Sequence, residues 1–419
     1  MKQSRKNSRT GRTTVVLYSS ALLSVGGIVS AAVFLIPAIS TIEYSATAIE
    51  SNIFSSSTQK IEVVKHLKTP EPLKAIYMSQ CVVGTPSFRD DLVKLVDETE
   101  LNALVIDIKD FTGKISFTTD NPKLSDSVSD ECGALDMKEF IKRLHEKDVY
   151  VIGRITVFQS PYHTKLHPEW AVQKKSVPGE VWKDYKGLSF IDVSATPYWE
   201  YIVELSKEAY AIGFDELNYD YVRYPSDGPM ADVNATWAKG KAKADALEDF
   251  FAYLSKQVKP TGAVLSADLF GMTTTNTDDL NIGQVLERSL PYFDYIAPMV
   301  YPSHFPKSFL NLGNPNKEPY KVVHHSMSEA AKRTMATTTT VSGLTHAVFS
   351  TTTKPHLYSK EAYSPLKLRP WLQDFDYGGE YGPDEVRAQI QATYDAGLTS
   401  WMLWAPSNRY TRAALDNVE

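Results

Sequence analysis

Short apolar runs alternate along the chain with longer amphipathic stretches, and this alternation constrains the fold more than any other feature. Eight runs have the length and the β-branched or apolar composition of strands. Repeated strand and helix units build a parallel sheet, and eight of them close into a barrel. We therefore predict an α/β fold, a (β/α)8 TIM barrel. Its strands are expected at residues 74–79, 103–108, 149–156, 216–221, 263–269, 295–301, 366–372 and 400–404.

The stretches between these runs have the spacing of helices. One of them has clear end signals, because Pro197 stands near its first turn and Gly213 follows its last turn, where a left-handed residue is favoured. Insertions follow three of the strands, where barrels carry functional loops; they cover residues 113–135, 158–194 and 334–364. The helices are expected at 88–98, 137–147, 197–212, 235–256, 282–290, 320–333 and 383–396.

The amino-terminal region has a different composition. Five basic residues fall within 1–12, and residues 13–41 are uncharged and mostly apolar or small, which is long enough to cross a bilayer. Basic residues beside a membrane span stay on the cytoplasmic side. We predict a basic cytoplasmic segment at 1–12, a transmembrane anchor at 13–41, a flexible linker at 42–72 and an extracellular barrel domain at 73–419. A small-residue stretch at 45–48 leaves signal cleavage and secretion as the alternative.

Charge and cysteine content exclude several classes of protein. A formal net charge of -6 and 43% hydrophobic residues exclude a disordered chain and a basic nucleic-acid binder. Cys81 and Cys132 are the two cysteines, and both fall just beyond predicted strand ends. They can form one structural disulfide or both remain reduced, because their spacing fits no zinc motif.

The segment from Gly213 to Pro225 carries the strongest functional signal. Side chains alternate along a strand, so Glu216, Asn218 and Asp220 share one face. The carboxyl ends of barrel strands open into the active-site mouth, which places Asp220 there with Arg223 nearby. The alternative is a structural Asp–Arg pair at the end of a strand.

Glycoside hydrolysis needs two carboxyl groups, and Asp220 and Asp268 end neighbouring predicted strands. Neighbouring strands lie about 5 Å apart, so these side chains can approach the roughly 5–5.5 Å separation of a retaining enzyme. We assign Asp220 as nucleophile and Asp268 as acid/base. Glu216 is the rival catalytic residue, although its greater depth suits pairing with a cation such as Arg154 or Lys109.

Other polar and aromatic side chains at strand ends are candidates for binding the substrate. Asp107 and Lys109 end one strand, and the alternative for them is an ion pair in the barrel floor. Aromatic rings suit the apolar faces of sugars, and Trp404 is preferred over Trp401 because it lies nearer the mouth. No metal and no organic cofactor are expected. The substrate-binding candidates are Asp107, Lys109, Arg154, Asn218, Arg223, Tyr301, His304, Arg369, Trp371 and Trp404.

Six segments together resemble the putative glycosyl hydrolase domain family, also called domain of unknown function 4015. They cover residues 102–110, 154–158, 167–170, 214–225, 297–304 and 368–375. The resemblance implies a TIM barrel similar to α-amylase-like and α-galactosidase-like enzymes, in which the Asp ending the fourth strand is the nucleophile. Asp220 matches that position. Amylase-like enzymes carry a Glu after the fifth strand, whereas this chain has Asp268.

These observations predict a membrane-anchored glycosidase that acts on a polysaccharide or oligosaccharide through two carboxyl groups. The alternative is a non-catalytic glycan-binding protein of the cell envelope that keeps the barrel and its aromatic side chains. A carboxyl pair facing an open cleft favours hydrolysis, whereas carboxylates all paired with Arg or Lys favour binding.

Overall fold

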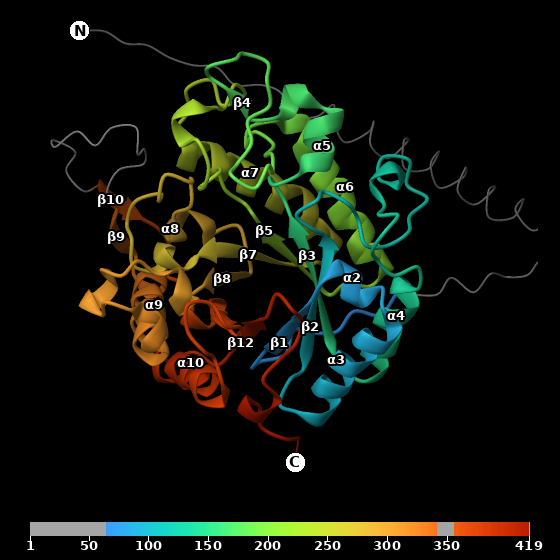
Figure 1. The fold of residues 1–419 in the computed structure, drawn as a ribbon, viewed down its shortest axis with the longest axis vertical. Helices are drawn as coiled ribbons and strands as arrows, with labels where there is room; N and C mark the ends of the chain where they lie inside the picture. The colour runs from blue at the N-terminus through green and yellow to red at the C-terminus, as the bar shows by residue number, and fades with distance from the viewer. Residues whose placement is uncertain (1–63, 342–355, 419) are drawn as a thin grey trace, which may run out of the picture. The chain divides into compact units, whose positions relative to one another are not determined.

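The computed structural model describes residues 64–341 and 356–418, and in them eight parallel strands close into a barrel (Figure 1). The strand order is β1-β12-β11-β8-β7-β5-β3-β2, so the strands follow one another around the barrel in chain order. The predicted fold is confirmed. The strands are β1 (Lys74–Met78), β2 (Ala103–Lys109), β3 (Tyr150–Thr156), β5 (Glu216–Asp220), β7 (Val264–Phe270), β8 (Tyr295–Met299), β11 (Trp371–Gln373) and β12 (Trp401–Trp404).

Helices surround the barrel on its outer side (Figure 1). In α4 (Met137–Glu146), Phe140, Ile141 and Leu144 recur at helical spacing and are buried, and burial of each such side chain contributes about 1.5–3 kcal/mol. The described helices are α2 (Gln80–Val83), α3 (Pro86–Glu98), α4 (Met137–Glu146), α5 (Pro161–Leu166), α6 (Thr196–Ile212), α7 (Lys243–Val258), α8 (Leu286–Ser289), α9 (Pro319–Met335) and α10 (Pro383–Asp395).

Three predicted elements begin at least four residues later in the structure than expected, whereas the other predicted boundaries differ by at most two residues. Helix α7 begins at Lys243 and not at residue 235, because Lys239 and Gly240 have positive φ and the chain before them pairs as β6 (Val233–Asn234) with β4 (Gln173–Lys174). Helix α8 is shorter than predicted. Strand β11 begins only at Trp371, since a 3-10 turn occupies Pro365–Lys367 and Pro370 lacks a backbone donor.

Gly213 ends α6 as predicted. Its φ is 125°, and a Cβ atom there would lie 3.0 Å from the side chain of Ile141. Strand β5 begins at Glu216, so the glycine turns the chain directly from α6 into the strand that carries Asp220.

The barrel has two apolar layers. Large side chains between strands and helices form the outer core, whereas Ala75, Val105, Ile152, Trp371 and Met402 belong to a separate cluster that fills the barrel interior. This inner cluster supports the polar side chains that follow it toward the carboxyl ends of the strands.

The chain packs against the barrel before Leu73. Leu67 donates its backbone N–H to Asp215 at 2.7 Å, and Thr69 is hydrogen bonded to the hydroxyl of Tyr150 at 2.9 Å. The predicted segments 1–12 and 13–41 lie outside the described residues. Among the residues that are described, no helix has the length and hydropathy of a membrane span.

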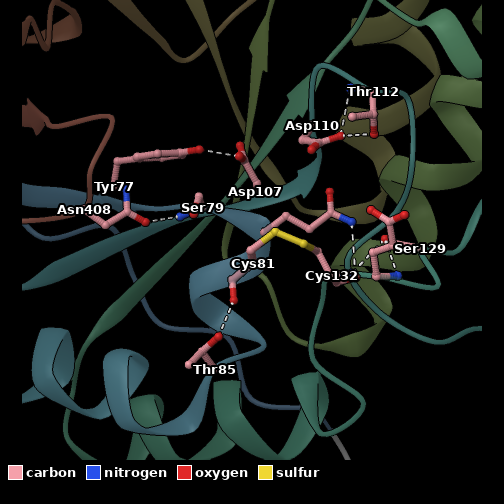
Figure 2. Close-up of a disulfide and its surroundings, with 12 residues drawn as sticks. Tyr77, Ser79, Cys81, Thr85, Asp107, Asp110, Thr112, Ser129, Cys132 and Asn408 are labelled. Atoms are coloured by element: carbon pink, nitrogen blue, oxygen red, sulfur yellow. Dashed lines mark hydrogen bonds between the residues drawn. A yellow bond between two sulfur atoms is a disulfide. The ribbon is translucent and has the colours of Figure 1, made fainter.

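A disulfide joins Cys81, which lies in α2 directly after β1, to Cys132 in the insertion after β2 (Figure 2). The two Cα atoms are 4.5 Å apart. The sequence left open a disulfide or two reduced thiols, and the structure contains the disulfide. In the third insertion, β9 (Thr338–Val341) pairs with β10 (His356–Ser359) as an antiparallel hairpin.

Candidate active site

A cavity of about 390 Å³ opens at the carboxyl ends of the barrel strands. Both predicted catalytic aspartates, Asp220 and Asp268, line it. Six of the predicted binding residues also line the cavity; they are Arg154, Arg223, Tyr301, His304, Trp371 and Trp404. The remaining predicted site residues, Asp107, Lys109, Glu216, Asn218 and Arg369, do not line it.

Arg154 is the central cation of this site. Its Nη1 donates to Asp107 at 2.6 Å, and its Nη2 donates to Asp220. Asp107 also accepts a hydrogen bond from the hydroxyl of Tyr77 (Figure 2). Burial opposes the charge on Arg154, but Asp107 and Asp220 outweigh burial and raise its pKa well above the ordinary value. The guanidinium therefore stays charged and fixes the position of Asp220.

Asp268 occupies a different environment from Asp220. Its Oδ1 accepts hydrogen bonds from Asn218 Nδ2 at 2.9 Å and Trp371 Nε1 at 2.8 Å, and its Oδ2 lies 3.9 Å from Arg154 Nε. Burial and the neighbouring charge of Asp220 raise the pKa of Asp268 well above its usual range. The protonated form of Asp268 is therefore favoured more strongly than in an exposed aspartic acid, as a general acid requires.

Asp220 ends β5 beside an unusual backbone conformation. Tyr221 has a φ of 51°, which few residues other than glycine adopt, and its N–H donates to Asp220 Oδ1 at 2.5 Å. Arg154 and the Tyr221 N–H thus hold the two oxygens of one carboxylate. Tyr221 itself lines the cavity, so this turn orients both side chains toward it.

Glu216 lies deeper in the barrel than Asp220. Its Oε2 accepts hydrogen bonds from Arg369 Nη1 at 2.8 Å and from the hydroxyl of Tyr150 at 3.1 Å. The predicted rival nucleophile is therefore paired with a cation, but with Arg369 and not with Arg154 or Lys109. Glu216 and Arg369 together form a buried ion pair in the barrel floor.

A β-bulge directs Lys109 away from the cavity. The strand register pairs Asp107 with Arg154 but Lys109 with Ile155, so one residue of β2 is left over between them. Lys109 Nζ donates to the carbonyl of Thr156 at 2.5 Å, and burial lowers its pKa to about 7. Asp107 is consequently paired with Arg154. The alternative of an ion pair between Asp107 and Lys109 is absent from the described hydrogen bonds and ion pairs, and neither residue lines the cavity as a substrate-binding residue would.

Arg223 and Tyr301 complete the polar part of the lining. Arg223 donates to the carbonyl of Tyr224 at 3.0 Å, and its guanidinium lies 4.7 Å from the ring centroids of both Tyr221 and Phe270. Burial, together with the charges of Asp268 and Asp220, raises the pKa of Tyr301. Its hydroxyl is therefore a neutral group beside the two aspartates.

Several lining residues were missed by the sequence analysis. Gly271 follows β7, and a Cβ there would lie 2.4 Å from the carbonyl oxygen of Met299, so only glycine fits. Tyr77 was also missed; it does not line the cavity itself but stacks on Trp404, which does, with ring centroids 4.0 Å apart. Tyr77 lies near the end of the first predicted strand, and this position could have identified it as a residue near the site. The other missed lining residues are Tyr221, Phe270, Met272, Met299 and Phe305.

Comparison with known proteins places this geometry in a family. The family model described as "Putative glycosyl hydrolase domain" matches residues 75–410, which confirms the resemblance seen in the six segments. No curated protein matches the chain.

Three solved structures are similar to this chain, and the two with a TM-score above 0.5 share its fold. The glycoside hydrolase domain of PgaB (BpsB) from Bordetella bronchiseptica is 15% identical over 82% of this chain and 99% of its own, with a TM-score of 0.54. The alpha-L-fucosidase isoenzyme 2 from Paenibacillus thiaminolyticus is 12% identical over 82% of this chain and 47% of its own, with a TM-score of 0.51. A hypothetical protein from Ruminiclostridium thermocellum ATCC 27405 is 31% identical over 46% of this chain and 96% of its own, with a TM-score of 0.42.

Proposed function

The chain belongs to the putative glycosyl hydrolase domain family, and we propose that it hydrolyses O-glycosidic bonds of a polysaccharide with Asp220 as nucleophile and Asp268 as acid/base. The family supports a glycosidase. The residue roles and the retaining mechanism are inferred from the site.

One observation carries the proposal. Asp220 ends β5 and Asp268 lies two residues before the end of the neighbouring β7. Both line one cavity and contact the same guanidinium, yet their environments differ. Asp220 accepts two charge-stabilising hydrogen bonds, while burial and Asp220 raise the pKa of Asp268. A retaining glycosidase requires two carboxyl groups with different roles, and the ion pair of Asp220 suits the nucleophile while the raised pKa of Asp268 suits the acid.

In the first step, Asp268 gives its proton to the glycosidic oxygen as the bond to the anomeric carbon breaks. The Asp220 carboxylate attacks that carbon and forms a glycosyl ester. Asp220 loses its negative charge in this step, but Arg154 still has Asp107 as an anionic partner. The cation at the site therefore stays compensated while the covalent intermediate exists.

In the second step, the ionised Asp268 takes a proton from water, and the oxygen of that water attacks the anomeric carbon. The ester bond breaks, the sugar leaves with its original anomeric configuration, and the Asp220 carboxylate returns to Arg154. Loss of the charge on Asp220 in the intermediate lowers the pKa of Asp268, because that charge raises it in the free enzyme. This shift favours the change of Asp268 from acid to base.

The proposal is tested with the purified full-length chain on a glycan panel of soluble starch, glycol chitosan, carboxymethyl cellulose, galactomannan and bacterial peptidoglycan. Release of reducing ends is measured, with the Asp220→Asn variant as the control. Product from the unmodified chain alone supports the proposal. Equal product from both proteins means that a contaminating enzyme or another residue is responsible.

A glycan-binding protein without hydrolytic activity is the second candidate. It is favoured by one observation, that both Asp107 and Asp220 are paired with Arg154. In that case Asp220 would neutralise a buried cation and would not attack the sugar. Binding of a panel glycan without any release of reducing ends over long incubation would select this candidate.

We also propose that the barrel lies outside the cytoplasmic membrane, tethered through residues 13–41. The uncharged segment after a basic amino terminus supports this location, and so does the disulfide, which is typical of oxidising compartments. Protease treatment of intact cells tests it. Degradation of the barrel without cell lysis is expected, and full protection would contradict the proposal.

A further inference from the structure

A second cavity, of about 670 Å³, adjoins the candidate active site. The two cavities share Tyr301, His304 and Trp404 as lining residues, so they are continuous along one side of the barrel mouth. The second cavity contains neither catalytic aspartate and is the larger of the two. A sugar bound between Asp220 and Asp268 therefore leaves the second cavity free for a further ligand group.

Aromatic rings extend from the active-site cavity into the second one. Trp371 contacts Trp404 edge to face, with centroids 5.7 Å apart. On the other side of the shared lining, His304 lies 5.7 Å from the ring of Tyr377. Tyr377 is 64% exposed, which is unusual for a tyrosine, and it lines only the second cavity. The lining thus offers flat apolar surfaces with polar edges beyond the catalytic centre.

The walls of the second cavity are held in place by partly buried hydrogen bonds. Asn316 Nδ2 donates to the carbonyl of Tyr377 at 2.8 Å. Asp374 accepts from the backbone N–H of Thr411 at 2.9 Å and from its hydroxyl at 2.6 Å, which ties the loop after β11 to the loop after β12. A preformed wall of this kind loses little conformational entropy when a ligand binds.

From this continuity we infer that the second cavity binds further sugar units of the chain whose bond is cut between Asp220 and Asp268. Tyr377 is the distal stacking residue. The substrate is therefore a polymer that occupies both cavities, and cleavage occurs within the chain and not only at its end. The inference rests on the proposed function for the cleavage, while binding in the second cavity is independent of catalysis.

The inference predicts a dependence on chain length. For each glycan of the panel that is cleaved, viscosity and product size are followed together with reducing ends. Oligosaccharides are expected as the first products, with a rapid loss of viscosity. Tyr377→Ala is expected to lower kcat/KM for the polymer about 5- to 20-fold more than for a disaccharide of the same sugar, which corresponds to about 1–2 kcal/mol. Tyr377→Phe keeps the ring and should restore most of that loss.

Tyr320→Ala is the matched control. Tyr320 is 38% exposed on α9 and lines neither of the two cavities, so this variant should leave the polymer-to-disaccharide ratio of kcat/KM unchanged. Monosaccharide as the first product, or an unchanged ratio in Tyr377→Ala, would overturn the inference and leave the glycosidase proposal intact.

Binding gives a readout that does not need turnover. The Asp220→Asn protein is run on native gels that contain each panel glycan, with and without the Tyr377→Ala substitution. Apparent affinities are obtained from the retardation. If Tyr377→Ala lowers the apparent affinity for a glycan at least about 5-fold, the second cavity is supported as a binding site even when no glycan is hydrolysed. Equal retardation of both proteins, or no retardation by any panel glycan, counts against it.

Discussion

Asp220 Oδ2 accepts a hydrogen bond from Nη2 of Arg154, whose Nη1 is bonded to Asp107 at 2.6 Å. One guanidinium therefore donates hydrogen bonds to two carboxylates, and only Asp220 of the two lines the cavity. This division gives Asp107 a structural role and leaves Asp220 available to a substrate.

Asp220→Asn is expected to reduce kcat by at least about 1,000-fold, because an amide cannot form the glycosyl ester. Folding should be retained, since Arg154 keeps Asp107 as a partner. Rates on a cleaved panel glycan and thermal unfolding curves are the measurements. A variant with full activity would remove the nucleophile assignment.

Asp268→Asn is expected to be most harmful for substrates with poor leaving groups. A general acid matters most when the leaving oxygen needs a proton, so activity on a dinitrophenyl glycoside should fall by less than activity on the natural glycan. We expect these two losses to differ by about 100-fold or more. The same loss for both substrates would show that Asp268 is not the acid.

The pH dependence of stability should change in the same variant. Because burial and Asp220 raise the pKa of Asp268, the folded state keeps this proton to higher pH than the unfolded chain does. The contribution of this proton to the free energy of unfolding is therefore fully present below the ordinary pKa of Asp, about 4. It is lost as the pH rises through the pKa of Asp268 in the folded state.

Replacing Asp268 with Asn removes that titration. Over this pH window, the stability of Asp268→Asn relative to the unmodified protein should rise by up to about 1.4 kcal/mol per pH unit. Urea unfolding at a series of pH values measures the difference. If that difference stays constant with pH, the carboxyl group has the same pKa in both states.

Arg154→Met should destabilise the fold by about 3–5 kcal/mol, since it leaves Asp107 and Asp220 buried without a cation. Arg143→Met provides the comparison, because Arg143 is 50% exposed in its pair with Asp136 and should cost less than about 1 kcal/mol. Chemical denaturation of both variants is the measurement. Similar small effects would mean that water or rearrangement compensates the two aspartates.

Much of the barrel could be predicted because each strand is a buried apolar run whose ends are visible in the sequence. The positions of Asp220 and Asp268 followed from the same pattern, since parallel strands place their carboxyl ends at one rim. The direction of the Lys109 side chain could not be predicted. Strand alternation puts Lys109 on the same face of β2 as Asp107, whereas a single-residue bulge between them turns it to the other face. Nothing local in the sequence marks this bulge.

Hydrogen-bond and ion-pair partners from distant segments of the chain also could not be predicted from the sequence. Glu216 pairs with Arg369, 153 residues away, and Tyr77 reaches Asp107 across neighbouring strands. Side-chain length and register decide such contacts, and both depend on the closed barrel. The cavity beside Tyr377 is formed by loops, whose conformations lack the periodicity that identifies strands and helices.

Removal of the disulfide should destabilise the protein without changing the active site. Cys81 and Cys132 are 51 residues apart, and closing a loop of that length in the unfolded chain corresponds to about 4 kcal/mol in the chain-entropy treatment. The double variant Cys81→Ser, Cys132→Ser should therefore lose about 2–4 kcal/mol of unfolding free energy, while kcat/KM on a cleaved panel glycan stays within about 2-fold. Reduction of the unmodified chain with dithiothreitol should reproduce the loss. A thiol titration under denaturing conditions distinguishes the alternatives, since two free thiols in protein from intact cells would show that the bridge does not form there.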